Sequence, residues 1–165
     1  GDVYKRQVLP DIGVYPLVTT RMVTEQEPIK VSSKIKYDKK FMTDIYASVE
    51  VTFKNFDLSF YVSTQMSLNQ KMTFHGSTGK IEIHAPFNAR LYGDAIVSLS
   101  KSDNSEKVHF RFGETNQYKL QIEAFADAIK RNDNSDLFSI QNSRNNQKII
   151  DKIFQSYKKQ KVLKI

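Results

Sequence analysis

The strongest constraint on the fold is an alternation of apolar and polar side chains over three successive stretches, residues 29–37, 45–54 and 56–66. Successive side chains of a strand point to opposite faces of a sheet, so each stretch predicts a strand with one apolar face. A turn at Asp38–Lys40 and a break of register at Asn55 separate the three stretches. This arrangement favours an antiparallel meander that is covered on one side only.

Shorter stretches of similar character continue along the chain, and Gly76 to Gly79 has the composition of a hairpin turn between two of them. The further strands are predicted at residues 71–75, 80–84, 89–92, 95–100 and 107–112, and residues 162–165 are predicted as a short terminal strand in addition to these. We therefore expect one open, largely antiparallel sheet of about six to eight strands, within the usual size range.

Helices are expected in three places, the first of them near residues 12–25. Residues 118–129 and 149–157 carry apolar side chains three and four positions apart, which is typical of a helix with one buried face. The polar run at residues 132–135 ends the second helix, and Ser143 is the predicted cap of the third. The predicted fold class is α+β, with an open, largely antiparallel β-sheet and helices packed on one face.

Two chemically active side chains, Asp11 and Tyr15, stand where the first helix is expected to begin. A spacing of four residues puts a carboxylate and a phenol on one helical face, an arrangement that would suit one half of a proton-transfer site. Gly13 between them leaves room for another backbone or a ligand, and Pro16 is compatible with a first turn. The simpler interpretations are that Asp11 caps the helix and Tyr15 packs in the core.

The segment Asp11-Ile12-Gly13-Val14-Tyr15-Pro16 is similar to the Asp-x-Gly-x-His/Tyr-Pro motif of the Gfo/Idh/MocA family of NAD(P)-dependent sugar and polyol dehydrogenases. Residues 76–83 resemble the hairpin in the middle of that family's sheet, and residues 118–129 resemble its next helix. Residues 145–165 resemble its closing helix and short final strand. The resemblance extends from about residue 8 to the end of the chain, whereas the family's Rossmann domain has no counterpart in this sequence.

The resemblance implies that Tyr15 takes the proton of a substrate hydroxyl while hydride leaves the same carbon for the nicotinamide. A free phenol titrates near about 10, so such a base needs a nearby cation, which in the family is a lysine of the Rossmann half. Asp11 would hydrogen-bond a substrate hydroxyl or that lysine. The resemblance also implies a sugar, polyol or diol substrate, and NAD or NADP bound mainly by the Rossmann half. Many family members carry histidine at the position of Tyr15, which leaves the substrate open.

The resemblance suggests how the chain is organised. Residues 8–165 are expected to form a single C-terminal domain that binds substrate, carries Asp11 and Tyr15, and forms a homo-oligomer through its sheet. Residues 1–7 do not continue the family pattern and are interpreted as junction residues. We expect the isolated chain to be inactive, because the dinucleotide loop and the lysine would belong to an N-terminal Rossmann partner.

The alternative interpretation is a stand-alone binding or oligomerisation module that uses the open face of the sheet. A broad exposed apolar patch on that face would favour association, whereas a polar face would favour solvent. The net charge of +7 raises the question of nucleic acid. The lysines near residues 34–40 and 158–164 lack an accompanying arginine-rich arm or aromatic motif, so no nucleic-acid partner is expected.

Metal and membrane functions are not expected either. His75, His84 and His109 fall in separate predicted strands, without the helical spacing of metal-binding histidine pairs. No stretch of eighteen apolar residues is present, so no membrane partner is predicted. The absence of cysteine fits a reducing compartment such as the cytoplasm.

Overall fold

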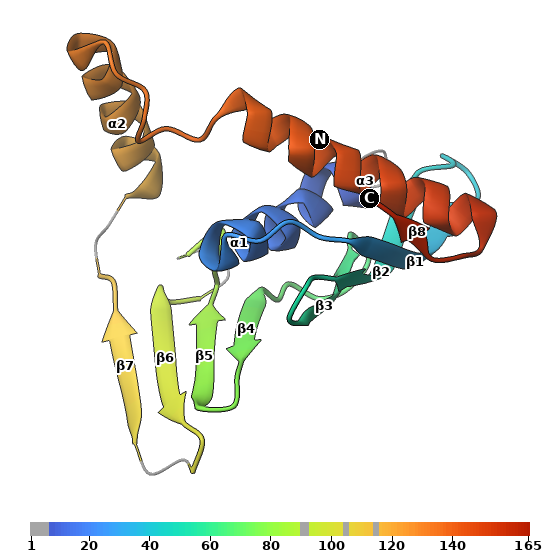
Figure 1. Cartoon of the computed structure of the whole chain (residues 1–165), viewed down its shortest axis with the longest axis horizontal. Coiled ribbons are helices and arrows are strands. Elements are labelled where there is room, and N and C mark those ends of the chain that lie inside the picture. The colour runs from blue at the N-terminus through green and yellow to red at the C-terminus, as the bar shows by residue number, and fades with distance from the viewer. Residues whose placement is uncertain (1–6, 90–92, 104–105, 114–115) are drawn as a thin grey trace. The chain divides into compact units, whose positions relative to one another are not determined.

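The computed structural model describes residues 7–89, 93–103, 106–113 and 116–165, which form two compact units (Figure 1). Unit 1 combines residues 1–66 with 138–165, and unit 2 consists of residues 67–137. The first six residues of the predicted junction lie outside the described residues, as do residues 90–92 of the strand predicted at 89–92.

The sheet of unit 1 has the strand order β3-β2-β1-β8, and all neighbouring strands are antiparallel. Its strands are β1 (Lys30–Tyr37), β2 (Asp44–Thr52), β3 (Asp57–Ser63) and β8 (Leu163–Lys164). Val31 lies opposite Val51, which in turn lies opposite Leu58, so the apolar side chains of three strands share one face. The predicted meander and the short terminal strand are both confirmed.

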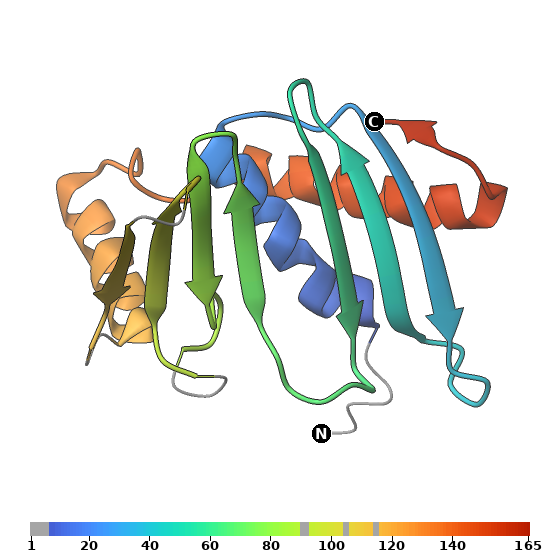
Figure 2. The ribbon, with the colours of Figure 1, turned by 90° about the horizontal axis from the view of Figure 1, so that it is seen from below.

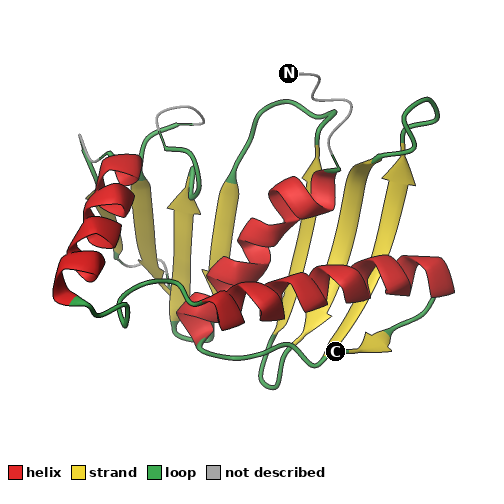
Figure 3. Ribbon diagram, turned by 90° about the horizontal axis from the view of Figure 1, so that it is seen from above, coloured by secondary structure: helices red, strands yellow, loops and turns green. Residues whose placement is uncertain are grey.

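Three helical segments pack over this apolar face, as Figures 2 and 3 show. They are the π-helix η2 (Leu9–Gly13), the helix α1 (Val14–Thr24) that continues it directly, and the long helix α3 (Ile140–Lys159). The helix predicted near residues 12–25 therefore begins three residues earlier, at Leu9.

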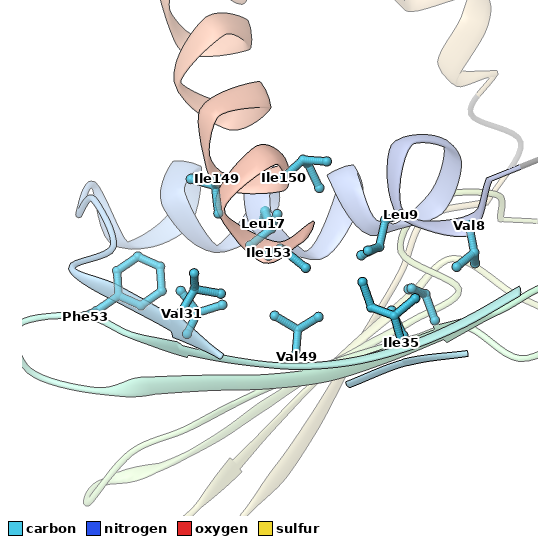
Figure 4. Close-up of a cluster of buried hydrophobic side chains, with 13 residues drawn as sticks. Val8, Leu9, Leu17, Val31, Ile35, Val49, Phe53, Ile149, Ile150 and Ile153 are labelled. Atoms are coloured by element: carbon cyan, nitrogen blue, oxygen red, sulfur yellow. The ribbon is translucent and has the colours of Figure 1, made fainter. Parts of the chain in front are cut away.

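The core of unit 1 lies between these helices and the sheet (Figure 4). Val49 and Val51 of β2 are fully buried, whereas Leu58 and Phe60 of β3 are partly buried against the same cluster. The helices contribute Val8, Leu9, Leu17, Ile149, Ile150 and Ile153. The prediction that the apolar stripe of the last helix packs in the core is therefore confirmed.

The cap of α3 differs from the prediction. Ser139 is the N-cap, and its Oγ accepts a hydrogen bond of 3.1 Å from the backbone N–H of Asn142. Ser143 lies one turn inside the helix, where its own N–H donates to the carbonyl oxygen of Ser139. A serine at residue 139 satisfies an otherwise unpaired first-turn donor, so the helix extends further than its apolar stripe indicates.

Unit 2 contains the antiparallel sheet β4-β5-β6-β7. Its strands are β4 (Lys71–His75), β5 (Gly79–His84), β6 (Ile96–Lys101) and β7 (Lys107–Arg111). Gly76 N–H donates to Gly79 O at 2.9 Å, which confirms the predicted hairpin turn. The register gathers apolar side chains on one face and mostly polar ones on the other. The apolar face consists of Met72, Phe74, Ile81, Ile83, Val97, Leu99, Val108 and Phe110.

The helix α2 (Gln117–Arg131) also belongs to unit 2. Asn116 caps its start and Asn132 ends it in the left-handed conformation, as the polar run predicted. Its apolar stripe is exposed, however, with Ile122 at 70% and Ile129 at 65% relative exposure. The prediction that this stripe is core is wrong for α2, because helical spacing reports one apolar face and not what covers it.

The eight strands among the described residues fall within the predicted six to eight, although they form two four-stranded sheets where one was expected. The fold class, an α+β fold with open antiparallel sheets, is confirmed. No helix in the described part of the chain is long and apolar enough to cross a membrane.

Candidate active site

Asp11 and Tyr15 lie four residues apart on the continuous helix formed by η2 and α1. Asp11 is in the first turn of η2, and Tyr15 is the second residue of α1. A step of four residues is close to one turn in both helix types, so the two side chains lie on the same side of the helix. The structure thus keeps the carboxylate and the phenol within one turn of each other.

The exposure of both side chains argues against the simpler interpretations. Tyr15 is 42% exposed and is not a core residue, and Asp11 is exposed as well. Asp11 does not occupy a cap position, because the caps of η2 and α1 are Val8 and Gly13, neither of which makes a side-chain cap bond. Both side chains are therefore at the surface of unit 1, where a ligand can reach them.

Gly13 and Pro16 of this segment have structural roles. A Cβ atom added to Gly13 would lie 2.9 Å from Cδ2 of Leu9, whose side chain is fully buried. The neighbour of Gly13 is thus the Leu9 side chain, in place of the ligand or backbone that the sequence suggested. Pro16 cannot donate the hydrogen bond that would continue the α-helical pattern to Ile12, and the turn before it is a π-turn.

The start of η2 is fastened to the sheet by Asp44, the first residue of β2. Oδ2 of this buried carboxylate accepts a hydrogen bond of 2.8 Å from the backbone N–H of Leu9. Burial raises the pKa of the Asp44 carboxyl above its usual value, and the backbone N–H groups of Leu9, Asp44 and Val8 partly oppose that rise. This role of Asp44 was not predictable from sequence patterns, because Asp44 and Leu9 are far apart along the chain.

The other end of α1 is held by Arg21, whose side chain is buried. Its guanidinium forms two hydrogen bonds to the carboxylate of Glu27, with Nε–Oε2 at 2.8 Å and Nη2–Oε1 at 2.6 Å. Nη1 donates to Asn142 O of α3 at 3.3 Å. The hydrogen bond from Arg21 lowers the pKa of Glu27, so the pair is ionised near neutral pH. Both ends of the helix that carries Asp11 and Tyr15 are therefore anchored.

A second group of polar side chains gathers on the polar face of the unit 2 sheet. The Glu82 carboxylate lies between the ammonium groups of Lys71 and Lys80, with Lys80 Nζ 3.0 Å from Oε2. Hydrogen bonds from Lys71 and then Lys80 lower the pKa of Glu82 to about 2. Ser98, opposite Glu82 in the register, is buried.

The three predicted strand histidines separate into one pair and one that lies apart. His84 Nε2 is 3.1 Å and His109 Nδ1 is 2.8 Å from Ser98 Oγ, so the register joins these two through a serine. His75, at the end of β4, lies opposite Lys80 in the register. Among the residues that the structure describes, no group of three or more His, Asp or Glu side chains has the arrangement of a metal site.

Comparison with known proteins identifies the family. The sequence profile of the GFO/IDH/MocA C-terminal domain matches residues 4–82, a range that includes the helix with Asp11 and Tyr15. Residues 4–82 belong to a GFO/IDH/MocA C-terminal domain. The chain is 32% identical over 129 residues to the uncharacterized oxidoreductase ORF334 of Rhizobium meliloti, an alignment that covers 74% of this chain and 38% of that protein.

Solved structures of oxidoreductases have the same fold as this domain. The aldose-aldose oxidoreductase of Caulobacter crescentus, complexed with glycerol, aligns at a TM-score of 0.80 and 16% identity, over 96% of this chain and 47% of that one. A variant of KijD10, a 3-ketoreductase from Actinomadura kijaniata in complex with TDP-benzene and NADP, aligns at a TM-score of 0.76 and 17% identity. That alignment covers 91% of this chain and 47% of KijD10. The chain thus spans less than half the length of each of these relatives.

Proposed function

We propose that this domain binds the substrate, and supplies the proton-transfer groups, of an NAD(P)-dependent oxidoreductase that acts on a hydroxyl of a sugar, polyol or diol. The observation that carries the proposal is the pairing of Asp11 and Tyr15, both exposed, on one side of a helix that is anchored at both ends. The family match over this helix and the oxidoreductase relatives support it.

In the proposed reaction Tyr15 Oη holds the proton that leaves the substrate hydroxyl during oxidation, or returns it during reduction. Asp11 accepts a hydrogen bond from a second substrate hydroxyl, or from the cation that supports the phenolate, and so orients the reacting carbon. A rigid helix suits both tasks, because small displacements of positioned groups are costly in rate.

The nicotinamide cofactor would exchange hydride with the substrate carbon, and among the described residues of this domain no glycine loop between a strand and a helix is suited to hold it. The glycine pair Gly76 and Gly79 lies in a β-hairpin, whereas dinucleotide sites place a glycine loop between a strand and a helix. We assign NAD or NADP binding mainly to an N-terminal Rossmann partner, in accord with the NADP in the KijD10 complex.

The test is the steady-state kinetics of the complete parent enzyme with Tyr15→Phe and with Asp11→Asn. Both variants should fold normally, and both should lose turnover with sugar, polyol or diol substrates. Wild-type turnover in both variants would refute the proposal.

A second candidate function, self-association through the sheet, is favoured by the apolar face of unit 2. Four of its side chains are well exposed, namely Ile81, Leu99, Val108 and Phe110, at 40–49% relative exposure. Contiguous apolar side chains at a surface are typical of an interface. The outward face of the unit 1 sheet is polar by contrast, with Tyr46 and Tyr61 stacked on each other and the ammonium of Lys36 over the Tyr46 ring. We propose a homo-oligomer that uses the apolar face of unit 2.

Sedimentation velocity of the chain tests this proposal. Val108→Glu places a charge on the apolar face and should shift the chain to a monomer. Lys107→Glu, at the adjacent residue on the opposite face of β7, is the control and should leave the oligomer intact. A wild-type monomer at all concentrations, or equal effects of both substitutions, would contradict the proposal.

A further inference from the structure

Asp44 is a buried charged residue that the proposed chemistry does not use. It is fully buried at the start of β2. Its carboxylate accepts a hydrogen bond from the backbone N–H of Leu9, 35 positions earlier in the chain. The Oδ1 atom has no hydrogen-bond partner among the described residues. A buried carboxylate with one unsatisfied oxygen is costly, so stability alone does not favour this residue here.

The carboxylate performs a task that a local cap normally performs. The first N–H groups of a helix lack intrahelical acceptors, and a polar N-cap side chain usually satisfies one of them. Here the N-cap is Val8, whose side chain is fully buried in the core and makes no cap bond. A carboxylate of the sheet takes over the role, and its charge also complements the positive end of the helix. The start of η2 is consequently tied to β2.

The residue opposite Asp44 in the sheet belongs to a pair of packed aromatic side chains. Tyr37 of β1 is its register partner, and the ring of Tyr37 packs on Tyr157 of α3 with a centroid separation of 5.6 Å. Both tyrosines are partly buried against the core. Burial raises the pKa of Tyr37, and the negative charge of Asp44 adds to the rise, so Tyr37 is a neutral phenol near neutral pH.

We propose that Asp44 is a positioning residue that fixes η2 on the sheet and thereby sets where Asp11 and Tyr15 meet the substrate. Leu9 precedes Asp11 by two residues and Tyr15 by six, so a shift at Leu9 is carried along the same rigid helix to both groups. This inference rests on the proposed function of Asp11 and Tyr15, although its structural half is independent of any reaction.

The first arm of the experiment measures amide hydrogen exchange and nuclear magnetic resonance shifts of the chain itself. Asp44→Ala should speed exchange of the Leu9 amide about 10- to 100-fold and shift the Tyr15 ring signals, because the N–H loses a charged acceptor. Asp44→Asn retains an acceptor oxygen and should stay close to wild type. Should Asp44→Ala fail to fold, Asp44→Glu replaces it, because it keeps the charge but displaces the carboxylate by one methylene.

Ser33→Ala is the matched control for this arm. It removes another hydrogen bond between the unit 1 sheet and a helix, the 2.8 Å bond from Ser33 Oγ to Ile153 O of α3. It should lower the melting temperature without changing Leu9 exchange or the Tyr15 signals. Unchanged Leu9 exchange in both Asp44→Ala and Asp44→Glu, or a Tyr15 shift as large in Ser33→Ala, overturns the proposal.

The second arm measures kinetics in the complete parent enzyme. Asp44→Ala, or Asp44→Glu in its place, should lower kcat/KM about 10- to 100-fold through misplacement, with Asp44→Asn and Ser33→Ala near wild type. If the Asp44→Ala enzyme, or the Asp44→Glu enzyme in its place, has wild-type kinetics, the proposed link between Asp44 and catalysis is overturned. Wild-type turnover in Tyr15→Phe would instead refute the proposed function, and the exchange arm would still decide whether Asp44 positions the helix.

Discussion

The side-chain amide of Asn146, on α3, donates a hydrogen bond of 3.2 Å to the carbonyl oxygen of Val14, the residue that precedes Tyr15. Its Oδ1 atom lies 3.5 Å from Nη1 of Arg21, so one buried amide contacts both the start and the end of α1. The long helix thus holds the segment that carries the candidate catalytic phenol, although the two are separated by more than a hundred residues in the chain.

Asn146→Ala should therefore destabilise unit 1 by about 1–3 kcal/mol, the usual cost of leaving a buried polar group without its partner. Chemical denaturation of the chain measures this loss. Gln147→Ala is the control, because Gln147 is exposed and its side-chain amide donates a hydrogen bond to Asp151 within the same helix. Equal stability of the two variants would show that the amide does not hold α1.

The sequence was sufficient to predict the elements of unit 1, because its alternation of side chains and the stripe of α3 both depend on local periodicity. The same periodicity was misleading for α2. Phe125 and Ile129 recur as regularly as Ile149 and Ile153, yet the first pair is exposed and the second is buried. A helical stripe records that a face is apolar, whereas its burial depends on elements elsewhere in the chain or outside it.

The candidate site was predictable to a similar extent. Asp11 and Tyr15 were recognisable because they lie within one short motif. The role of Asp44 was not, because its contact with Leu9 depends on how β2 meets η2. The contacts of His84 and His109 with the Ser98 hydroxyl were not predictable either, because they depend on the register of three strands.

The carboxylate of Glu82 should make the stability of the chain depend on pH. Its pKa is lowered to about 2 in the folded state, so its stabilising effect is full above the unfolded value of about 4.3 and is lost as pH falls toward 2. Glu82→Gln should lower the melting temperature at pH 7, and the difference from wild type should shrink as pH falls below about 4.3.

Glu106→Gln is the control for Glu82, because the ion pair of Glu106 with Lys101 is exposed on both sides. Exposed ion pairs contribute little to the stability of a fold, so the melting temperature of this variant should follow that of the wild type at every pH. A melting difference for Glu82→Gln that stays constant from pH 7 to pH 3 would contradict the assigned role of the two lysines.

Isolated, the 165-residue chain should not bind NAD(H) or NADP(H) measurably. The described glycines supply no strand-loop-helix turn that would place a helix N-terminus against a pyrophosphate. Isothermal titration calorimetry should show only heats of dilution up to about 1 mM dinucleotide, the upper end of common KM values. Tight, stoichiometric binding by this chain would contradict the assignment of the cofactor to another domain.

The most direct test of the account is the turnover number of the complete parent enzyme with Tyr15→Phe. The substitution keeps the aromatic ring and removes the hydroxyl proposed to carry the proton, so kcat should fall by about 10²–10⁴ while the melting temperature stays near wild type. Tyr61→Phe, at another exposed tyrosine of unit 1, is the control and should leave kcat unchanged. A Tyr15→Phe enzyme with wild-type turnover and an unaltered pH profile would contradict the central claim.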